Sequence, residues 1–260
     1  MTVGGTLSDA YQRDDGLWVI PREEFARDRF DYEPGEHVVF GGPTQRGKTT
    51  LAFALLEYVA TPELPAYVAV SKPNDPTTER EGKRLNYRRV DEWPPTKEFR
   101  EMTGDRRSGY LVWPKFGDMD KDVVRSASVT RNLLQERYTA GARGKKNSQG
   151  ILVMDDTMVK AKILGLDREM TTILAMAGAM GIGQWTFVQK PTDSGRTALW
   201  SYGAAEHVFI VKDPDRRSRM RYDEIGGFDP KKVSYATESL RPFQFLYLKR
   251  TEAYMCVVDK

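Results

Sequence analysis

A glycine-rich segment that ends in lysine and threonine offers the clearest chemistry in the sequence. It runs Gly42-Pro-Thr-Gln-Arg-Gly-Lys-Thr49 and matches the P-loop pattern G-x-x-x-x-G-K-[ST] at every required position. Its two glycines let the backbone fold around a phosphate without a Cβ clash, and successive N–H groups then point at anionic oxygens. Lys48 would reach the β- and γ-phosphates of a nucleoside triphosphate, and the Thr49 hydroxyl would take a Mg²⁺ position.

The surroundings of this phosphate loop (residues 42–49) agree with that interpretation. An apolar strand pattern at residues 37–40 precedes the loop, and a helical pattern at 51–60 follows it, as the motif requires. The alternative is a glycine turn before a helix that happens to contain Lys-Thr. The residues expected to bind ATP are Gly42, Pro43, Thr44, Gln45, Arg46, Gly47, Lys48, Thr49 and Thr50.

Two carboxylates follow a short, wholly apolar run, Ile151-Leu-Val-Met-Asp155-Asp156. A buried strand would bring them to its C-terminal edge, where α/β sheets bind ligands. We expect Asp155 to hold Mg²⁺ through water and Asp156 to orient or deprotonate the attacking water. The alternative is a strand followed by an ordinary acidic turn.

A third strand pattern ends in Gln189-Lys-Pro191. The neutral amide of Gln189 would reach the same sheet edge, where it could contact the γ-phosphate or the lytic water. By itself this is a weak signal, because polar residues often end strands.

The elements that position these residues alternate between apolar strands and helices. Strand patterns cover 37–40, 65–70, 109–113, 151–154, 184–188 and 207–211, and helical patterns cover 51–60, 120–138 and 167–179. This alternation predicts an α/β fold whose mainly parallel central sheet is covered on both faces. Residues 243–249 and 253–258 would add an antiparallel C-terminal hairpin at the sheet edge. We expect an N-terminal arm at 1–30 and one domain at 31–260.

Composition limits the class of protein. The 260 residues are 40% hydrophobic and 30% charged, which describes a globular protein with a real core. Forty basic and 37 acidic side chains leave a net charge of +3, too balanced to indicate nucleic-acid binding by itself. We expect a cytoplasmic protein without a membrane partner, because apolar runs are short, no signal-peptide pattern is present and Cys256 is the single cysteine.

The three motifs together resemble the FtsK–HerA superfamily of P-loop ATPases, which includes DNA translocases, conjugation ATPases and viral packaging ATPases. The residues that match are 42–49, 151–156 and 181–191, and the chain is most similar to small ATPases of actinobacterial phages and mobile elements. The resemblance implies a three-layer, RecA-like P-loop NTPase that hydrolyses ATP with Mg²⁺. It also implies a hexameric ring with duplex DNA bound in its pore without sequence preference. A phage portal or a nuclease subunit would be a further partner.

Two positions depart from the family pattern. Asp156 stands where Glu is common, and Gly178 stands where many members have an arginine. An arginine finger, which can accelerate phosphoryl transfer about 10³–10⁵-fold, must then come from elsewhere. Arg143 and Arg168 are the candidates for reaching a neighbouring subunit's γ-phosphate, and the alternative for each is an ordinary surface arginine.

Three basic segments are candidates for DNA contact. The first is the glycine-rich stretch 139–149, and the other two are Arg216, Arg217, Arg219 and Arg221, and Arg80, Lys83, Arg84, Arg88 and Arg89. A solvated surface is the alternative for each.

Three functions remain open at this point. An ATP-driven DNA motor agrees with all three motifs. A P-loop switch or assembly factor that translocates nothing would need the same site. A nucleoside or small-molecule kinase is disfavoured, because no arginine-rich lid is evident between the second and third motifs and because Gln189-Lys-Pro191 belongs to the motor pattern.

Overall fold

The computed structural model describes residues 9–96, 107–145, 148–189, 196–222, 225 and 227–260. Within these ranges, eleven strands form one sheet in the order β1-β2-β11-β10-β9-β3-β8-β7-β4-β6-β5. The strands that run parallel to one another are β3 (Val38–Gly41), β4 (Ala66–Ala69), β5 (Arg88–Val90), β6 (Gly109–Val112), β7 (Gly150–Met154), β8 (Ile182–Val188) and β9 (His207–Val211). The predicted parallel sheet is therefore confirmed.

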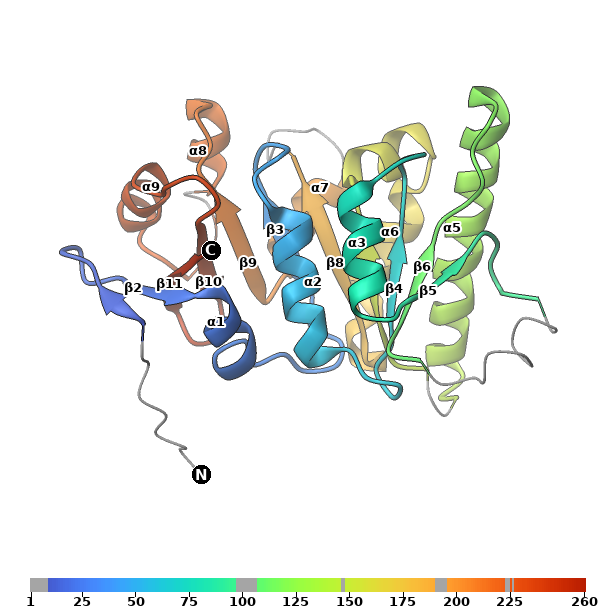
Figure 1. Cartoon of the computed structure of the whole chain (residues 1–260), viewed down its shortest axis with the longest axis horizontal. Coiled ribbons are helices and arrows are strands. Elements are labelled where there is room, and N and C mark those ends of the chain that lie inside the picture. Colours follow the sequence, from blue (N-terminus) through green and yellow to red (C-terminus); the bar gives the residue numbers. More distant parts are fainter. Residues whose placement is uncertain (1–8, 97–106, 146–147, 190–195, 223–224, 226) are drawn as a thin grey trace.

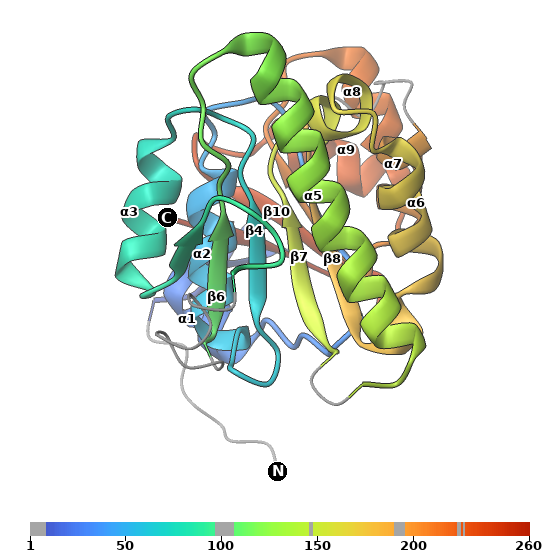
Figure 2. The ribbon, with the colours of Figure 1, turned by 90° about the vertical axis from the view of Figure 1, so that its right-hand side faces the viewer.

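Helices cover both faces of the sheet, which gives three layers (Figures 1 and 2). One face carries α1 (Arg22–Asp28), α2 (Lys48–Val59) and α3 (Pro76–Arg84). The other carries α5 (Met119–Ala142), α6 (Asp167–Met176), α7 (Arg196–Ala204), α8 (Arg216–Tyr222) and α9 (Pro230–Glu238). A π-helix at Val159–Ile163 and a 3₁₀ turn at Gly178–Met180 flank α6. None of the described helices is both long enough and apolar enough to span a membrane.

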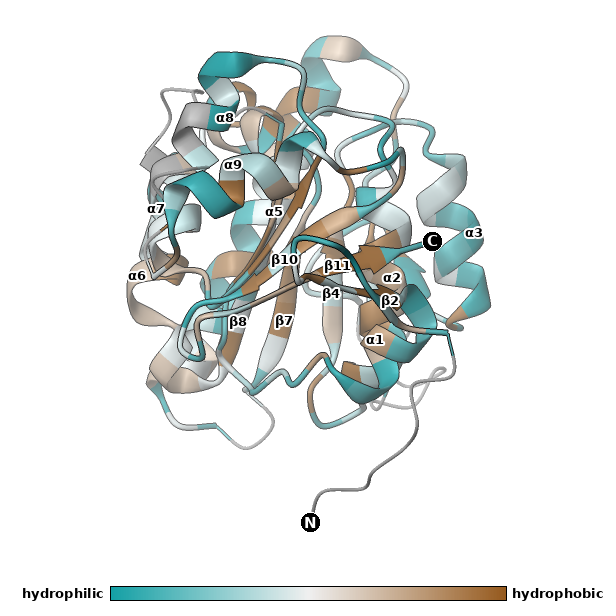
Figure 3. Ribbon diagram, turned by 90° about the vertical axis from the view of Figure 1, so that its left-hand side faces the viewer, coloured by the Kyte–Doolittle hydropathy of each residue, from teal (hydrophilic) through white to brown (hydrophobic). Residues whose placement is uncertain are grey.

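The central strands are apolar because both of their faces are covered. β3 shows why: Val38, Val39 and Phe40 all have 0% of their surface exposed. Phe40 packs between Phe187 and Phe209 with ring centroids 4.8 and 5.1 Å apart. Hydrophobic colouring accordingly concentrates on the strands in Figure 3, whereas α3 is mainly hydrophilic. Burial on both faces removes the alternation that marks a half-exposed strand.

The C-terminal hairpin is antiparallel as predicted, but it is not the edge of the sheet. β10 (Phe245–Lys249) and β11 (Tyr254–Asp259) pair with each other, and β11 continues in parallel into β2 (Trp18–Pro21). β1 (Tyr11–Gln12) then closes this side. The expectation of an edge hairpin was wrong, because an N-terminal segment supplies the next strand.

Much of the expected N-terminal arm packs against the domain. Val19, Ile20 and Phe25 are each at most 2% exposed. The Phe25 ring lies 4.7 Å from that of Tyr247 and is part of the core that contains α2. The segment therefore contributes two strands, a helix and core side chains.

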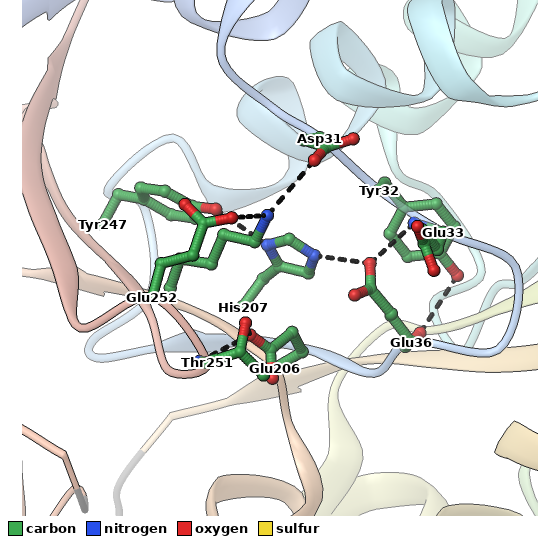
Figure 4. A network of polar contacts seen from close by, with 10 residues as sticks. Asp31, Tyr32, Glu33, Glu36, Glu206, His207, Tyr247, Thr251 and Glu252 are labelled. Carbon is green, nitrogen blue, oxygen red and sulfur yellow. Dashed lines mark hydrogen bonds and ion pairs between the residues drawn. The ribbon is translucent and has the colours of Figure 1, made fainter.

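The linker from α1 into β3 is held by a polar network at the edge opposite the phosphate loop (Figure 4). Nε2 of His207 lies 2.9 Å from Oε2 of Glu36, and its Nδ1 lies 2.8 Å from the Tyr247 hydroxyl. Lys249 forms ion pairs with Asp31 and Glu252. Since these contacts join the linker to β9 and β10, they fix where β3 begins.

His37 continues this anchoring inside the sheet. Its Nδ1 accepts a hydrogen bond of 2.9 Å from the backbone N–H of Gln184. Burial of the ring lowers the pKa of His37 to about 4, because the charged imidazolium would lose its hydration. His37 is therefore a neutral acceptor at physiological pH, which explains a structural role for this histidine.

Gly183 on β8 lets the same linker approach the sheet closely. A Cβ atom there would overlap the Tyr32 hydroxyl and the Glu36 carbonyl oxygen. Tyr32 donates to that carbonyl at 3.0 Å, so the two groups cannot move apart independently.

We predict that Gly183→Ala lowers the free energy of unfolding by about 1–3 kcal/mol, because the added methyl overpacks the linker. Urea unfolding of the purified proteins measures the change. Gly203→Ala is the matched control: Gly203 lies in α7 with nothing within 4 Å of its ideal Cβ, so this variant should be no less stable than the wild type. Equal stability of Gly183→Ala and wild type would contradict the prediction.

Candidate functional site

The phosphate loop leaves the end of β3 in a conformation that requires glycine. Gly42 has φ +114° and Gly47 has φ +84°. A Cβ at Gly42 would lie 2.5 Å from Cγ2 of Val211 on the neighbouring strand. The N–H of Gly42 donates to the carbonyl of Val188 at 2.9 Å, which joins the loop to β8. The turn is therefore packed tightly between two strands before α2 begins at Lys48.

Lys48 lies folded across the loop. Its Nζ donates to the carbonyl oxygens of Gly42 and Pro43 at 2.5 and 2.6 Å, and 8% of the residue is exposed. Burial lowers the pKa of Lys48 to about 8, although the charges of Asp156 and Asp213 act in the opposite direction. Among the described residues this buried ammonium is hydrogen-bonded to carbonyl oxygens and to no carboxylate, so its charge is only partly compensated. The site would therefore favour an anionic ligand such as a polyphosphate.

Asp156 and Gln189 meet beside the loop. Nε2 of Gln189 donates to Oδ2 of Asp156 at 2.8 Å. Asp156 has φ +42°, an uncommon conformation for a non-glycine residue, and its Oδ1 accepts from the Val159 N–H at 3.3 Å. The strained backbone turns this carboxylate toward the loop and the end of β8.

Asp155 lies on the other side of the β7 terminus, next to β4. Its carboxylate accepts from the hydroxyl and the N–H of Ser71 at 2.7 and 3.0 Å. Its Oδ1 also forms a 2.9 Å ion pair with Lys160. The two adjacent carboxylates therefore have different environments: Asp156 lies near Lys48 and Gln189, and Asp155 lies in a network with a buried lysine.

The phosphate loop, the two aspartates and Gln189 line one cavity of about 210 Å³. It is lined by Thr44, Gln45, Arg46, Gly47, Lys48, Thr49, Thr50, Lys72, Asp75, Thr77, Asp155, Asp156, Phe187 and Gln189. All three sequence motifs thus meet at one site. Gly42 and Pro43 complete the loop beneath it through their carbonyl contacts with Lys48.

Several lining residues were not identified from the sequence. Lys72, Asp75 and Thr77 follow β4, whose C-terminal end lies beside that of β7. Asp75 accepts from the Thr78 N–H at 3.0 Å and so begins α3. The Ser71-Lys72 pair at the end of a predicted strand was a usable signal, since parallel strands present their C-terminal residues at one edge.

Lys160 was also missed. It belongs to the π-helix after β7, has 0% of its surface exposed, and donates to the Ser71 hydroxyl at 2.6 Å. In the sequence it stands in Val-Lys-Ala-Lys, two positions before the exposed Lys162, and nothing distinguishes the two. Only the fold shows that one of them faces inward.

The candidate arginines lie away from the cavity of their own chain. Arg143 is exposed at the C-terminal end of α5, at the sheet edge opposite the phosphate loop. Arg168 is exposed at the start of α6, where it lines a different cavity with Tyr138 and Thr172. Gly178 packs against Gly35, also at the opposite edge. Among the arginines whose side chains the structure describes, Arg46 is the one that lines the cavity at the phosphate loop.

The basic segments differ in how their charges are compensated. Those on α3 form ion pairs: Arg80 with Glu81, Lys83 with Glu79, and Arg84 with Glu57 and Glu81. Arg89 stacks over Trp113, 4.3 Å from the ring centroid. The stretch 139–149 lies partly outside the described residues, because positions 146 and 147 are not described.

Comparisons with known proteins rest on structure, since no protein-family model and no curated protein sequence matches the chain. B204, the DNA-packaging ATPase of Sulfolobus turreted icosahedral virus, superposes with a TM-score of 0.56 at 13% identity over 88% of this chain and 98% of its own. B204 of Sulfolobus turreted icosahedral virus 2 with AMPPCP gives 0.55 at 12% identity, covering 87% and 98%.

The cytoplasmic domain of the type VII secretion ATPase EccC from Thermomonospora curvata gives a TM-score of 0.59 at 12% identity. The match covers 96% of this chain and 28% of that one. These likenesses confirm the expected three-layer, RecA-like fold.

We predict that Lys160→Met lowers the free energy of unfolding by about 3–5 kcal/mol, because Asp155 would keep its charge without its buried partner. The 15% exposure of the Asp155 side chain favours the lower end of that range. Asp155→Asn combined with Lys160→Met should recover much of the loss, and urea unfolding of both variants and each single variant measures the coupling.

Lys162→Met is the matched control, because Lys162 is exposed on the same turn and its loss should change stability little. If Lys160→Met and Lys162→Met are equally stable, Lys160 does not compensate Asp155.

Proposed function

We propose that this chain is an ATP-hydrolysing motor of the FtsK–HerA type that binds and translocates DNA, with viral or phage genome packaging as its process. The supporting observation is the single cavity in which the phosphate loop, Asp156 and Gln189 meet. The named activity of the B204 proteins supports the choice of DNA as cargo.

The phosphate loop would hold the nucleotide. Its backbone N–H groups and the start of α2 would face the phosphate oxygens, and Lys48 would exchange its carbonyl contacts for the β- and γ-phosphates. Thr49 and Asp155 both line the cavity, and each would offer an oxygen ligand of the kind that Mg²⁺ prefers. A bound Mg²⁺ would neutralise charge on the phosphate oxygens.

Asp156 and Gln189 would act on the attacking water. The 2.8 Å hydrogen bond between them fixes the carboxylate and leaves the remaining amide positions to contact water or the γ-phosphate. Asp156 would orient this water and accept its proton as the oxygen–phosphorus bond forms. Its side chain is one methylene shorter than Glu, and the positive φ brings its carboxylate to Gln189.

The chain would work as a ring, with six subunits as the expected number. Head-to-tail contacts that close into a ring would let a neighbour supply the arginine, and Arg143 and Arg168 are both exposed for this role. Duplex DNA would bind in the pore through phosphates, without sequence preference. A portal or nuclease subunit would be a further partner, and the bacterial cytoplasm, including that of a phage-infected cell, is the compartment where ATP and DNA meet.

We predict ATP hydrolysis that is stimulated by duplex DNA, falls with salt and rises with protein concentration as rings assemble. ATPase assays with and without DNA, paired with mass photometry in a slowly hydrolysed ATP analogue, measure these effects.

Lys48→Ala should abolish hydrolysis with the fold intact, because Lys48 would contact the phosphates of the nucleotide. Nucleotide affinity should also weaken as pH rises past about 8, because Lys48 then loses its charge in the free site.

A protein that stays monomeric, with activity indifferent to concentration and DNA, would leave a nucleotide switch as the function. Wild-type rates in Lys48→Ala would reject the nucleotide site itself.

We predict that Asp156→Asn lowers turnover by about 10²-fold or more while nucleotide binding is retained, since the carboxylate acts on water. Asp155→Asn should instead weaken the Mg²⁺-dependent part of nucleotide affinity. Fluorescent-nucleotide titrations with Mg²⁺ and with EDTA separate the two roles. Equal loss of binding in both variants would show that the division is wrong.

A further inference from the structure

We propose that the arginine-rich helix α8 contacts the phosphate backbone of the DNA, and that Asp213 and Tyr222 transmit this contact to the phosphate loop. This proposal rests on the proposed motor function and names the surface by which DNA would stimulate ATP hydrolysis. Three observations support it: α8 lies at the edge of the sheet that carries the phosphate loop, two of its arginines have no acidic partner among the described residues, and Tyr222 contacts the loop.

The fold places α8 at the nucleotide edge of the sheet. β9 pairs in parallel with β3, with Gly41 opposite Ile210, so Asp213 follows β9 beside the start of the phosphate loop. α8 begins three residues later, at Arg216. Figure 1 shows α8 and the loop before α2 at the same edge of the molecule. A ligand on α8 would therefore lie close to the nucleotide.

The arginines at the start of α8 are available for an external anion. Arg216 and Arg217 are exposed, and neither forms an ion pair with an acidic side chain in the described part of the chain. This distinguishes them from Arg80 and Lys83 on α3, which are paired with acidic neighbours. Arginine donates to phosphate in a fixed, bidentate geometry, and neutralising phosphates gives affinity without sequence preference.

Arg219 holds the helix instead of facing outward. Its guanidinium donates to the carbonyls of Asp213 and Pro214 at 2.9 and 3.1 Å, and it also pairs with Glu238 on α9 at 3.3 Å. These contacts join α8 to α9 and to the residues that follow β9. A displacement of the exposed start of α8 would therefore also displace Asp213.

Asp213 and Tyr222 connect α8 to the loop. Asp213 is 5% exposed and accepts from the Asp215 N–H at 2.9 Å and from the Tyr222 hydroxyl at 3.4 Å. The Tyr222 ring lies against the loop: an ideal Cβ at Gly41 would be 3.3 Å from its Cε1, and one at Gly42 would be 3.5 Å from its hydroxyl.

A shift of α8 would therefore move Tyr222, the tyrosine that packs on the first turn of the phosphate loop. This movement would act on phosphate binding without any direct contact between DNA and nucleotide.

The first test removes the exposed charges. In Arg216→Ala/Arg217→Ala, DNA affinity should fall, and the slope of log affinity against log salt should decrease in magnitude by about 2. Arg80→Ala/Lys83→Ala removes the same charge from already paired positions and should keep the wild-type slope. Fluorescence anisotropy of a labelled duplex across salt concentrations measures both, with thermal unfolding as the check on folding.

The second test separates transmission from binding. Tyr222→Phe keeps the ring and removes the hydroxyl bond to Asp213, so the salt slope should be unchanged while the ratio of DNA-stimulated to DNA-free hydrolysis falls. Tyr235→Phe is the control, because Tyr235 lies on the neighbouring helix α9, is 61% exposed and has no hydrogen bond to Asp213 among the described residues.

The outcomes distinguish this proposal from the motor function. If the wild type binds DNA and the double arginine variant keeps the full salt slope, α8 is not the contact surface, although the motor can stand. If Tyr222→Phe keeps the stimulation ratio, the transmission through Asp213 is overturned. If the wild type shows no DNA binding at all, the motor function and this inference fall together.

Discussion

The position of β3 between β8 and β9 is the constraint on which the rest of the molecule depends. A group at or beside the candidate site follows each strand: the phosphate loop after β3, Gln189 after β8 and Asp213 after β9. Parallel pairing brings these ends to one edge, and complete burial of β3 holds their register. The polar network around His207 and the close approach at Gly183 fix the other end of the same strands.

The site also depends on two buried lysines, of which one is paired with a carboxylate and the other is bonded to carbonyl oxygens. Lys160 forms an ion pair with Asp155 and a hydrogen bond with Ser71, so its charge is satisfied inside the protein. Among the described residues, the Lys48 ammonium is hydrogen-bonded to carbonyl oxygens alone, and burial lowers its pKa. The first arrangement stabilises a fixed scaffold between β4 and β7, and the second leaves a charge that an arriving polyphosphate can satisfy.

The fold and the central site were largely predictable, because the signals for them are local. The phosphate loop is a contiguous motif, and the apolar runs of β3, β7 and β8 are bounded by glycine or polar residues. A π-helix that turns Lys160 inward has no comparable pattern, and its neighbour Lys162 is exposed. The parallel pairing of β2 with β11 was equally invisible, since it joins opposite ends of the chain.

The sequence alone determined the chemical groups that this protein can offer: a glycine-rich turn of the P-loop pattern, two carboxylates and an amide, each at the end of an apolar strand. The glycine spacing of the turn and the wholly apolar composition of strands that are buried on both faces are visible in the order of the residues. These features therefore needed no coordinates. Tertiary structure decided which carboxylate lies near Lys48, which of Lys160 and Lys162 is buried, and that Arg216 and Arg217 have no acidic partner in the described part of the chain. Those properties depend on side chains from strands and helices far apart in the chain, and their electrostatics exist only once the fold has excluded water between them.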